Sequence, residues 1–143
     1  MKRSALYLLA APLVFTAGCA TNRGYISLNL PAETAATTTD RTVAIRSVAD
    51  MRRFADNPDD PSTPSLGFGG IEKVSADERK RAIARKRNSY GKALGDIFLD
   101  EGQTVELLVS DLLKSSMREL GYTVVEHGQA RADTLLMDVT IEK

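Results

Sequence analysis

His127, the only histidine in the chain, is the first candidate for acid–base chemistry. A Ser-His-Asp hydrolase places a serine nucleophile and an orienting carboxylate next to such an imidazole. Ser110, Ser115 and Asp111 are available, but they fall within a predicted helix and lack the sharp turn that exposes a nucleophile. His127 itself precedes Gly128 in a predicted turn, where a solvated side chain is the simpler interpretation. The sequence therefore predicts no enzyme and no catalytic residue.

Metal and nucleotide sites have equally few candidate ligands. Asp56, Asp59 and Asp60 offer carboxylates for calcium, but their spacing differs from an EF-hand loop and two prolines intervene. His127 has no second imidazole with which to hold zinc. The glycines within residues 67–70 are not followed by the Gly-Lys-Ser or Gly-Lys-Thr step of a phosphate-binding loop. We expect no metal and no cofactor.

Cys19, the only cysteine, follows an export signal. Lys2 and Arg3 form its positive start, and residues 5–15 form an apolar run that is too short to span a bilayer. The sequence Thr16-Ala17-Gly18-Cys19 then resembles the lipobox of bacterial lipoproteins, although Thr16 stands where Leu is usual. This resemblance implies removal of residues 1–18 and acylation of Cys19. Each acyl methylene contributes roughly 0.8 kcal/mol to membrane binding, so the anchor is effectively permanent.

The alternative is an ordinary cleaved signal followed by an incidental cysteine. The position of the one cysteine at the end of the lipobox favours lipidation. Residue 20 is Ala rather than the Asp that favours retention in the inner membrane of enteric-type bacteria. The lipoprotein resemblance therefore implies the outer membrane, on its periplasmic face.

The composition is that of one small globular domain. The 143 residues are 43% hydrophobic and 27% charged. Of 19 basic and 19 acidic side chains, Lys2 and Arg3 leave with the signal, so the mature chain is slightly acidic. That balance argues against general nucleic-acid binding, which needs a broadly basic face. A lone cysteine also excludes an internal disulfide.

Residues 19–40 are interpreted as the lipidated cysteine and a flexible tether, and residues 41–143 as a periplasmic domain. Residues 32–40 are almost entirely Ala, Thr and acidic residues, as in flexible linkers. Gly24 to Leu30 alternates apolar residues and is either a short edge strand or a sticky patch on the linker. Residues 55–70 are rich in proline and glycine and predict a long loop.

Three strands are predicted, over residues 41–48, 122–126 and 135–141. In the first, Val43 and Ile45 share one face, and Val48 lies on the other. A long helix from about Thr104 to Leu120 has an apolar stripe that is expected to form the core, and Gly121 ends it. The stripe consists of Val105, Leu108, Val109, Leu112, Leu113, Met117 and Leu120. These elements predict an α/β (α+β) fold in which the long helix packs on a small mixed or antiparallel sheet.

A short basic helix is predicted from about Ala76 to Arg87, because Ser75-Ala-Asp-Glu78 is a capping-box pattern. Residues 90–99 follow as an extended, partly paired segment. The basic patch of this region comprises Arg79, Lys80, Arg81, Arg85, Lys86, Arg87 and Lys92. Such a patch could bind anionic lipid headgroups, an acidic polysaccharide or an acidic protein surface. The alternative is a solvated helix face.

The chain also resembles the YajG-type outer-membrane lipoproteins over residues 40–143. The matching pieces are Gly18-Cys19, the strand Thr42-Val43-Ala44-Ile45, and the long helix followed by Gly121-Tyr122. The resemblance implies a sheet with helices packed on it, the layout shared by the accessory lipoproteins LpoB and PelC, and it carries over no catalytic residue. Family members continue past the strand that ends here, so the domain is expected to be shortened at its carboxyl end.

These observations predict a membrane-anchored periplasmic accessory lipoprotein that binds a protein or glycan partner in the envelope. The membrane itself is contacted through the lipid on Cys19. The alternative is a structural subunit of an oligomeric assembly, in export or flagellar machinery, because the last strand offers an open pairing edge.

Overall fold

The computed structural model describes residues 23–32, 34, 38–56, 66, 71–91 and 93–142. The predicted signal and Cys19 lie outside these residues, as do Asp59, Asp60 and most of the predicted 55–70 loop. The fold is α+β, as predicted. Its elements are β1 (Gly24–Ile26), β2 (Thr42–Asp50), α1 (Ala76–Arg81), β3 (Ala82–Arg87), β4 (Ala93–Leu99), α2 (Val105–Glu119), β5 (Thr123–Val124) and β6 (Leu135–Ile141), with short 3-10 turns at Ile71–Lys73 and His127–Gln129.

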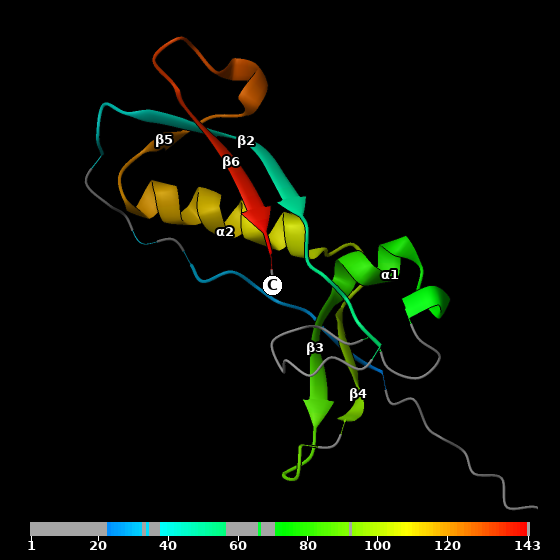
Figure 1. Cartoon of the computed structure of the whole chain (residues 1–143). Coiled ribbons are helices and arrows are strands. Elements are labelled where there is room, and N and C mark those ends of the chain that lie inside the picture. The colour runs from blue at the N-terminus through cyan, green and yellow to red at the C-terminus, as the bar shows by residue number, and fades with distance from the viewer. Residues whose placement is uncertain are drawn as a thin grey trace, which may run out of the picture.

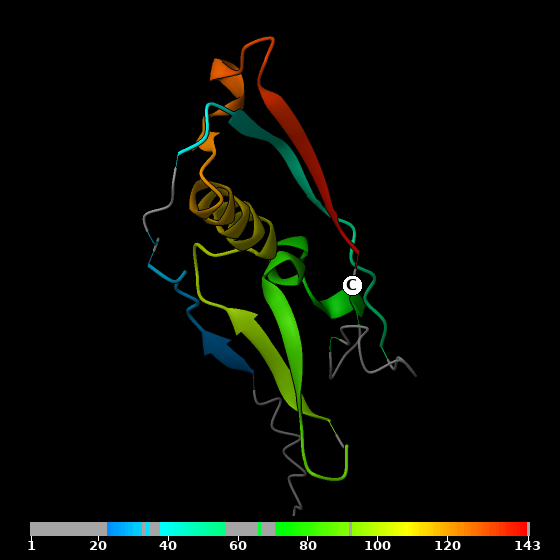
Figure 2. The same cartoon turned by 90° about the vertical axis from the view of Figure 1, so that its left-hand side faces the viewer.

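The strands divide between two three-stranded sheets, whereas the sequence predicted one. The first has the order β5-β2-β6, with both pairings parallel, and α2 packs on β2 and β5. The second has the order β1-β4-β3, with β1 parallel and β3 antiparallel to β4. Figure 1 shows the two sheets at opposite ends of the molecule, with the helices between them. Figure 2 shows the same arrangement from the side.

A bulge in β2 changes which side chains share a face. The register with β6 runs from Ile45↔Met137 to Ser47↔Asp138, so Arg46 is the extra residue. Val48 pairs with Val139 and therefore shares the face of Ile45. The prediction that Val48 lies opposite Ile45 was wrong, because strict alternation does not continue through a bulge.

The long helix is confirmed as α2. Thr104 is its N-cap, and its side chain accepts a hydrogen bond from the N–H of Leu107. Gly121, at φ 86°, follows the helix in the left-handed conformation that glycine adopts most easily. The expectation that the whole apolar stripe forms the core was wrong. Leu112 and Leu120 are exposed, the other stripe residues are half-buried, and Ser115 is the only buried residue of α2.

The predicted basic helix is half helix and half strand. α1 has the predicted capping box, with the Glu78 N–H donating to Ser75 and the Ser75 N–H donating to Glu78, but it ends at Arg81. The next six residues form β3 and pair with β4. The helix was predicted too long because pairing with β4 is a long-range interaction that overrides local helix propensity. The predicted extended segment at residues 90–99 is confirmed as β4.

The predicted tether is partly built into the fold. Gly24–Ile26 forms the edge strand β1 beside β4. Beyond it, the Leu28 N–H donates to Oε1 of Gln103 at 3.1 Å, and Nε2 of Gln103 donates to the Leu28 carbonyl at 2.8 Å. The N–H of Thr39 donates to the Gly121 carbonyl at 2.7 Å. The chain is therefore hydrogen-bonded near both ends of α2 before β2 begins, so residues 24–28 and Thr39 of the predicted tether contact the fold.

The described residues form an apolar core on the β1-β4-β3 sheet, and two further buried residues lie in β2. Phe98, Ala82, Val74 and Leu66 pack together on the β1-β4-β3 sheet, with Phe54 against them. Val43 and Ala44 are buried in the β5-β2-β6 sheet. Within the described part of the chain, no helix has the length and apolar character needed to cross a membrane.

Candidate interaction surfaces

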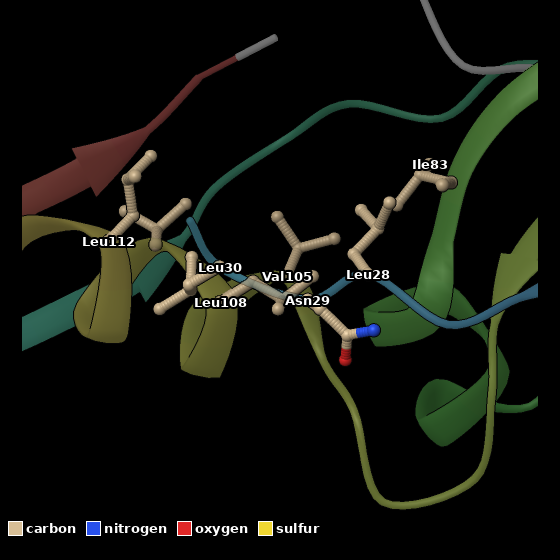
Figure 3. A pocket seen from close by; sticks show the side chains of 8 residues that line it. Leu28, Asn29, Leu30, Ile83, Val105, Leu108 and Leu112 are labelled. Atoms are coloured by element: carbon tan, nitrogen blue, oxygen red, sulfur yellow. The ribbon is translucent and has the colours of Figure 1, made fainter. Parts of the chain in front are cut away.

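An aliphatic groove runs between α2 and the segment that follows β1. The groove encloses about 320 Å³, and Figure 3 shows side chains from three parts of the chain converging on it. Leu28, Asn29 and Leu30 form one wall, α2 forms the other, and Ile83 of β3 lies at one end. The residues of α2 in the groove are Val105, Leu108, Val109 and Leu112. Asn29 is its one polar residue, so the groove suits an apolar occupant.

The groove wall is fixed by hydrogen bonds to the backbone of Ile26 and Leu28. The reciprocal hydrogen bonds of Gln103 with Leu28 hold the wall beside the first turn of α2. The Asp100 N–H also donates to the Ile26 carbonyl at 3.0 Å, which fixes the chain just before the wall. The groove is therefore preformed at this end. The sequence analysis identified the apolar residues of both walls but did not predict that they meet.

A polar hollow of about 310 Å³ adjoins the groove, because Leu30 lines both. Its other residues include Asp111, Lys114 and Arg118 on the next turns of α2. Nζ of Lys114 also forms an ion pair with Glu126 at 3.0 Å. Together the two hollows form a continuous surface along α2 that is aliphatic near its start and charged near its end.

β6 forms an open edge of the β5-β2-β6 sheet. It pairs with β2, and no described strand lies on its other side. Leu135 and Leu136 are 51% and 45% exposed. Asp138 is the only charged side chain of β6. A seven-residue edge with one charge and no proline lacks the usual protection of edge strands against pairing with another chain.

Asp138 is held by the bulge in β2. The Arg46 guanidinium forms a bidentate ion pair with the Asp138 carboxylate. Oγ of Ser47 also donates a hydrogen bond to Oδ1 of Asp138 at 2.7 Å. Hydrogen bonds from Arg46 and Ser47, with the nearby charges of Arg46 and His127, hold the pKa of Asp138 well below its usual range. The bulge therefore neutralises the only charge on the β6 edge.

Three residues of the predicted basic patch have internal roles. Arg79 donates to the carbonyls of Val74 and Ile71, and Nε of Arg81 donates to the Leu99 carbonyl at 2.9 Å. Arg85 lies 3.9 Å from Asp96 in a mostly buried ion pair between β3 and β4. These contacts connect α1 to the segment before it and to β4, and β3 to β4.

The rest of the basic patch is dispersed. Lys80 lies 4.0 Å from Asp77 on α1, and Lys86 and Arg87 lie near the end of β3. Lys92 lies outside the described residues. Because β3 is an edge strand, its charged side chains can protect it from pairing with another chain. The described patch residues are therefore divided between α1 and β3, whereas the sequence predicted that Arg79 to Arg87 lie on one helix.

Among the described residues, those first considered for catalysis or metal binding are not brought together, and Asp59 and Asp60 lie outside them. His127 is exposed in a 3-10 turn, whereas Ser110, Asp111 and Ser115 lie on α2. Oδ1 of Asp56 accepts a hydrogen bond from the Ile71 N–H at 2.6 Å. Among the described residues, no three histidine, cysteine or acidic side chains lie close enough to hold a metal ion.

With this geometry established, the chain can be compared with known proteins. The comparison finds no matching protein-family model, no matching curated protein and no matching solved structure.

Proposed function

We propose that the chain is a lipid-anchored accessory protein of the bacterial envelope that binds a protein partner and catalyses no reaction itself. The anchor is supported by the lipobox-like sequence ending at Cys19 and by the resemblance to YajG-type lipoproteins. The aliphatic groove between α2 and residues 28–30 is the observation that carries the binding role.

The chemistry of the groove favours a protein over a glycan. Aliphatic walls gain free energy from burying apolar side chains but cannot pair with the hydroxyl groups of a sugar. An exposed apolar patch rimmed by polar groups is typical of a protein interaction site. Here the groove continues into the charged hollow at Asp111, Lys114 and Arg118. The partner is therefore expected to insert a short segment with aliphatic side chains at one end and charged ones at the other.

The proposal can be tested by photo-crosslinking in intact cells. A photoreactive amino acid replaces Leu112, which lines the groove and is 48% exposed. Leu107 provides a matched control, because it is 53% exposed on the same helix but is absent from the groove. We expect one discrete protein adduct from position 112 and none from position 107.

A second substitution makes the result specific to the groove. Leu30→Lys places a charge in the opposite wall and is expected to abolish the adduct from position 112, whereas Leu107→Lys leaves it unchanged. Adducts of the same mass from both positions, or an adduct that survives Leu30→Lys, would contradict binding in the groove. So would the absence of any adduct from position 112.

The β6 edge favours a second candidate function, that of a subunit in an oligomeric envelope assembly. Two edges of this kind can join by adding strands to each other's sheets. The full lipoprotein in detergent would then sediment as an oligomer, and Leu135→Lys would shift it toward the monomer. A monomer at all concentrations tested would exclude self-association through β6 and leave the groove proposal unaffected.

A further inference from the structure

A third hollow lies at the amino ends of β2 and β5 and encloses about 450 Å³. Thr42 and Thr123 are paired across these strands and line the hollow together with Val125. The segment leading into β6 supplies the other side, through Gln129, Arg131, Asp133 and Thr134. Six of the seven residues that line the hollow are of polar types, whereas the groove has only one polar residue.

The segment from Arg131 to Thr134 is a closed turn. The Arg131 N–H donates to Oγ1 of Thr134 at 2.9 Å, and the Thr134 N–H donates to the Arg131 carbonyl at 3.0 Å. This turn fixes the backbone that carries both charged side chains of the hollow. A ligand would therefore meet a site whose backbone is already ordered, which lowers the entropic cost of binding.

Arg131 and Asp133 bring opposite charges to one hollow without pairing with each other. Among the described residues, neither side chain takes part in an ion pair or a hydrogen bond. A guanidinium can bind a carboxylate through two parallel hydrogen bonds. A carboxylate accepts hydrogen bonds from an ammonium group. The hollow thus offers partners for both charges of one small molecule.

We propose that this hollow binds a small zwitterion, an amino acid or short peptide whose ammonium and carboxylate groups are both free. Arg131 holds the carboxylate and Asp133 holds the ammonium group. The hydroxyls of Thr42 and Thr123 and the amide of Gln129 hydrogen-bond the atoms between them. This site is separate from the aliphatic groove and does not depend on the proposed function.

The test is a titration of the full chain in detergent micelles, followed through backbone amide chemical shifts. The probes are the dipeptide alanyl-alanine, its N-acetylated form without the ammonium group, and its carboxyl amide without the carboxylate. We expect alanyl-alanine to shift the amides of Gln129, Arg131 and Thr134. Each blocked form is expected to bind at least about tenfold more weakly, equivalent to ~1.4 kcal/mol.

Two variants assign the two charges. Asp133→Asn is expected to remove the preference for alanyl-alanine over its N-acetylated form, and Arg131→Gln the preference over its amide. Arg53→Gln and Glu101→Gln, which change exposed charges outside the hollow, serve as controls and should leave both preferences intact. Unchanged backbone amide chemical shifts in the spectra of the control variants verify that these variants retain the fold.

Three results would overturn the proposal. The first is the absence of shifts in the hollow with alanyl-alanine. The second is equal binding of the dipeptide and its two blocked forms. The third is binding of glucose, a neutral sugar, as strong as that of the dipeptide, which would assign the hollow to polyols.

Discussion

Arg52 donates two parallel hydrogen bonds to the Asp50 carboxylate, from Nε to Oδ1 at 2.8 Å and from Nη2 to Oδ2 at 2.7 Å. Both side chains are almost fully buried, at 5% and 9% exposure. The same guanidinium donates to the carbonyls of Ala82 and Arg79, where α1 meets β3, and lies over the ring of Phe54. Since Asp50 ends β2, this pair joins one sheet to the other.

Removing Arg52 should therefore destabilise the whole fold. Arg52→Gln leaves the Asp50 carboxylate buried without its partner, and we expect a loss of about 3–5 kcal/mol in the free energy of unfolding. Urea denaturation monitored by circular dichroism measures this loss. The neighbouring Arg53→Gln alters an exposed side chain and is the control, with an expected change within about 0.5 kcal/mol. Equal effects of the two substitutions would show that the pair does not join the sheets.

The Asp50–Arg52 pair should also make stability depend on pH. Burial alone would raise the pKa of Asp50, but hydrogen bonds from Arg52 and its charge lower the pKa below the ordinary value. A carboxyl whose pKa is lowered by folding contributes stability above its unfolded pKa of about 3.9, and this contribution is lost as pH falls through the lower folded pKa.

Comparison of wild type with Asp50→Asn isolates this contribution. Glu78 and Asp138 also have lowered pKa values and remain in both proteins. We expect the stability advantage of wild type at about pH 6 to shrink by about pH 3. An advantage that stays constant or grows over this range would show that the pKa of Asp50 is not lowered by folding.

The N-cap of α2 gives a third prediction. Thr104→Ala removes the acceptor for the Leu107 N–H and should cost about 1 kcal/mol, whereas Thr104→Ser retains the hydroxyl and should cost less. Thermal unfolding of the two variants measures the difference. Equal losses would mean that the hydroxyl does not cap the helix.

Gln103 gives a fourth prediction, on the wall of the aliphatic groove. Gln103→Ala breaks both hydrogen bonds to Leu28, so hydrogen exchange at the Leu28 amide should accelerate while exchange within α2 changes little. Gln129→Ala, at an exposed residue of a 3-10 turn, is the matched control. Unchanged exchange at Leu28 in Gln103→Ala would show that the wall is held by other contacts.

Local patterns predicted the elements that depend on local interactions. The long helix was found because its periodicity, the Thr104 cap and the Gly121 stop all agree. The last strand was found because residues 135–141 alternate clearly. The α1 start was found from its capping box, but the strand β3 was missed because Ala82–Arg87 is extended only through its pairing with β4.

The candidate surfaces depend on long-range contacts, and the sequence predicted them only in part. The segment with Leu28 and Leu30 was predicted to be either an edge strand or an exposed apolar patch. Its position beside α2 depends on Gln103, which lies 75 residues from Leu28. Arg52 carries no sequence signal that separates it from Arg53. The partners that distinguish them, Ala82 and Arg79, are also distant in the sequence.

The most direct test of the central claim is metabolic labelling with radioactive palmitate. We predict that label enters the wild-type protein and that the protein fractionates with the outer membrane. Cys19→Ser should abolish both the labelling and the membrane fractionation. Absence of label from wild type, or unchanged membrane fractionation of Cys19→Ser, would contradict the account of a lipid-anchored envelope protein.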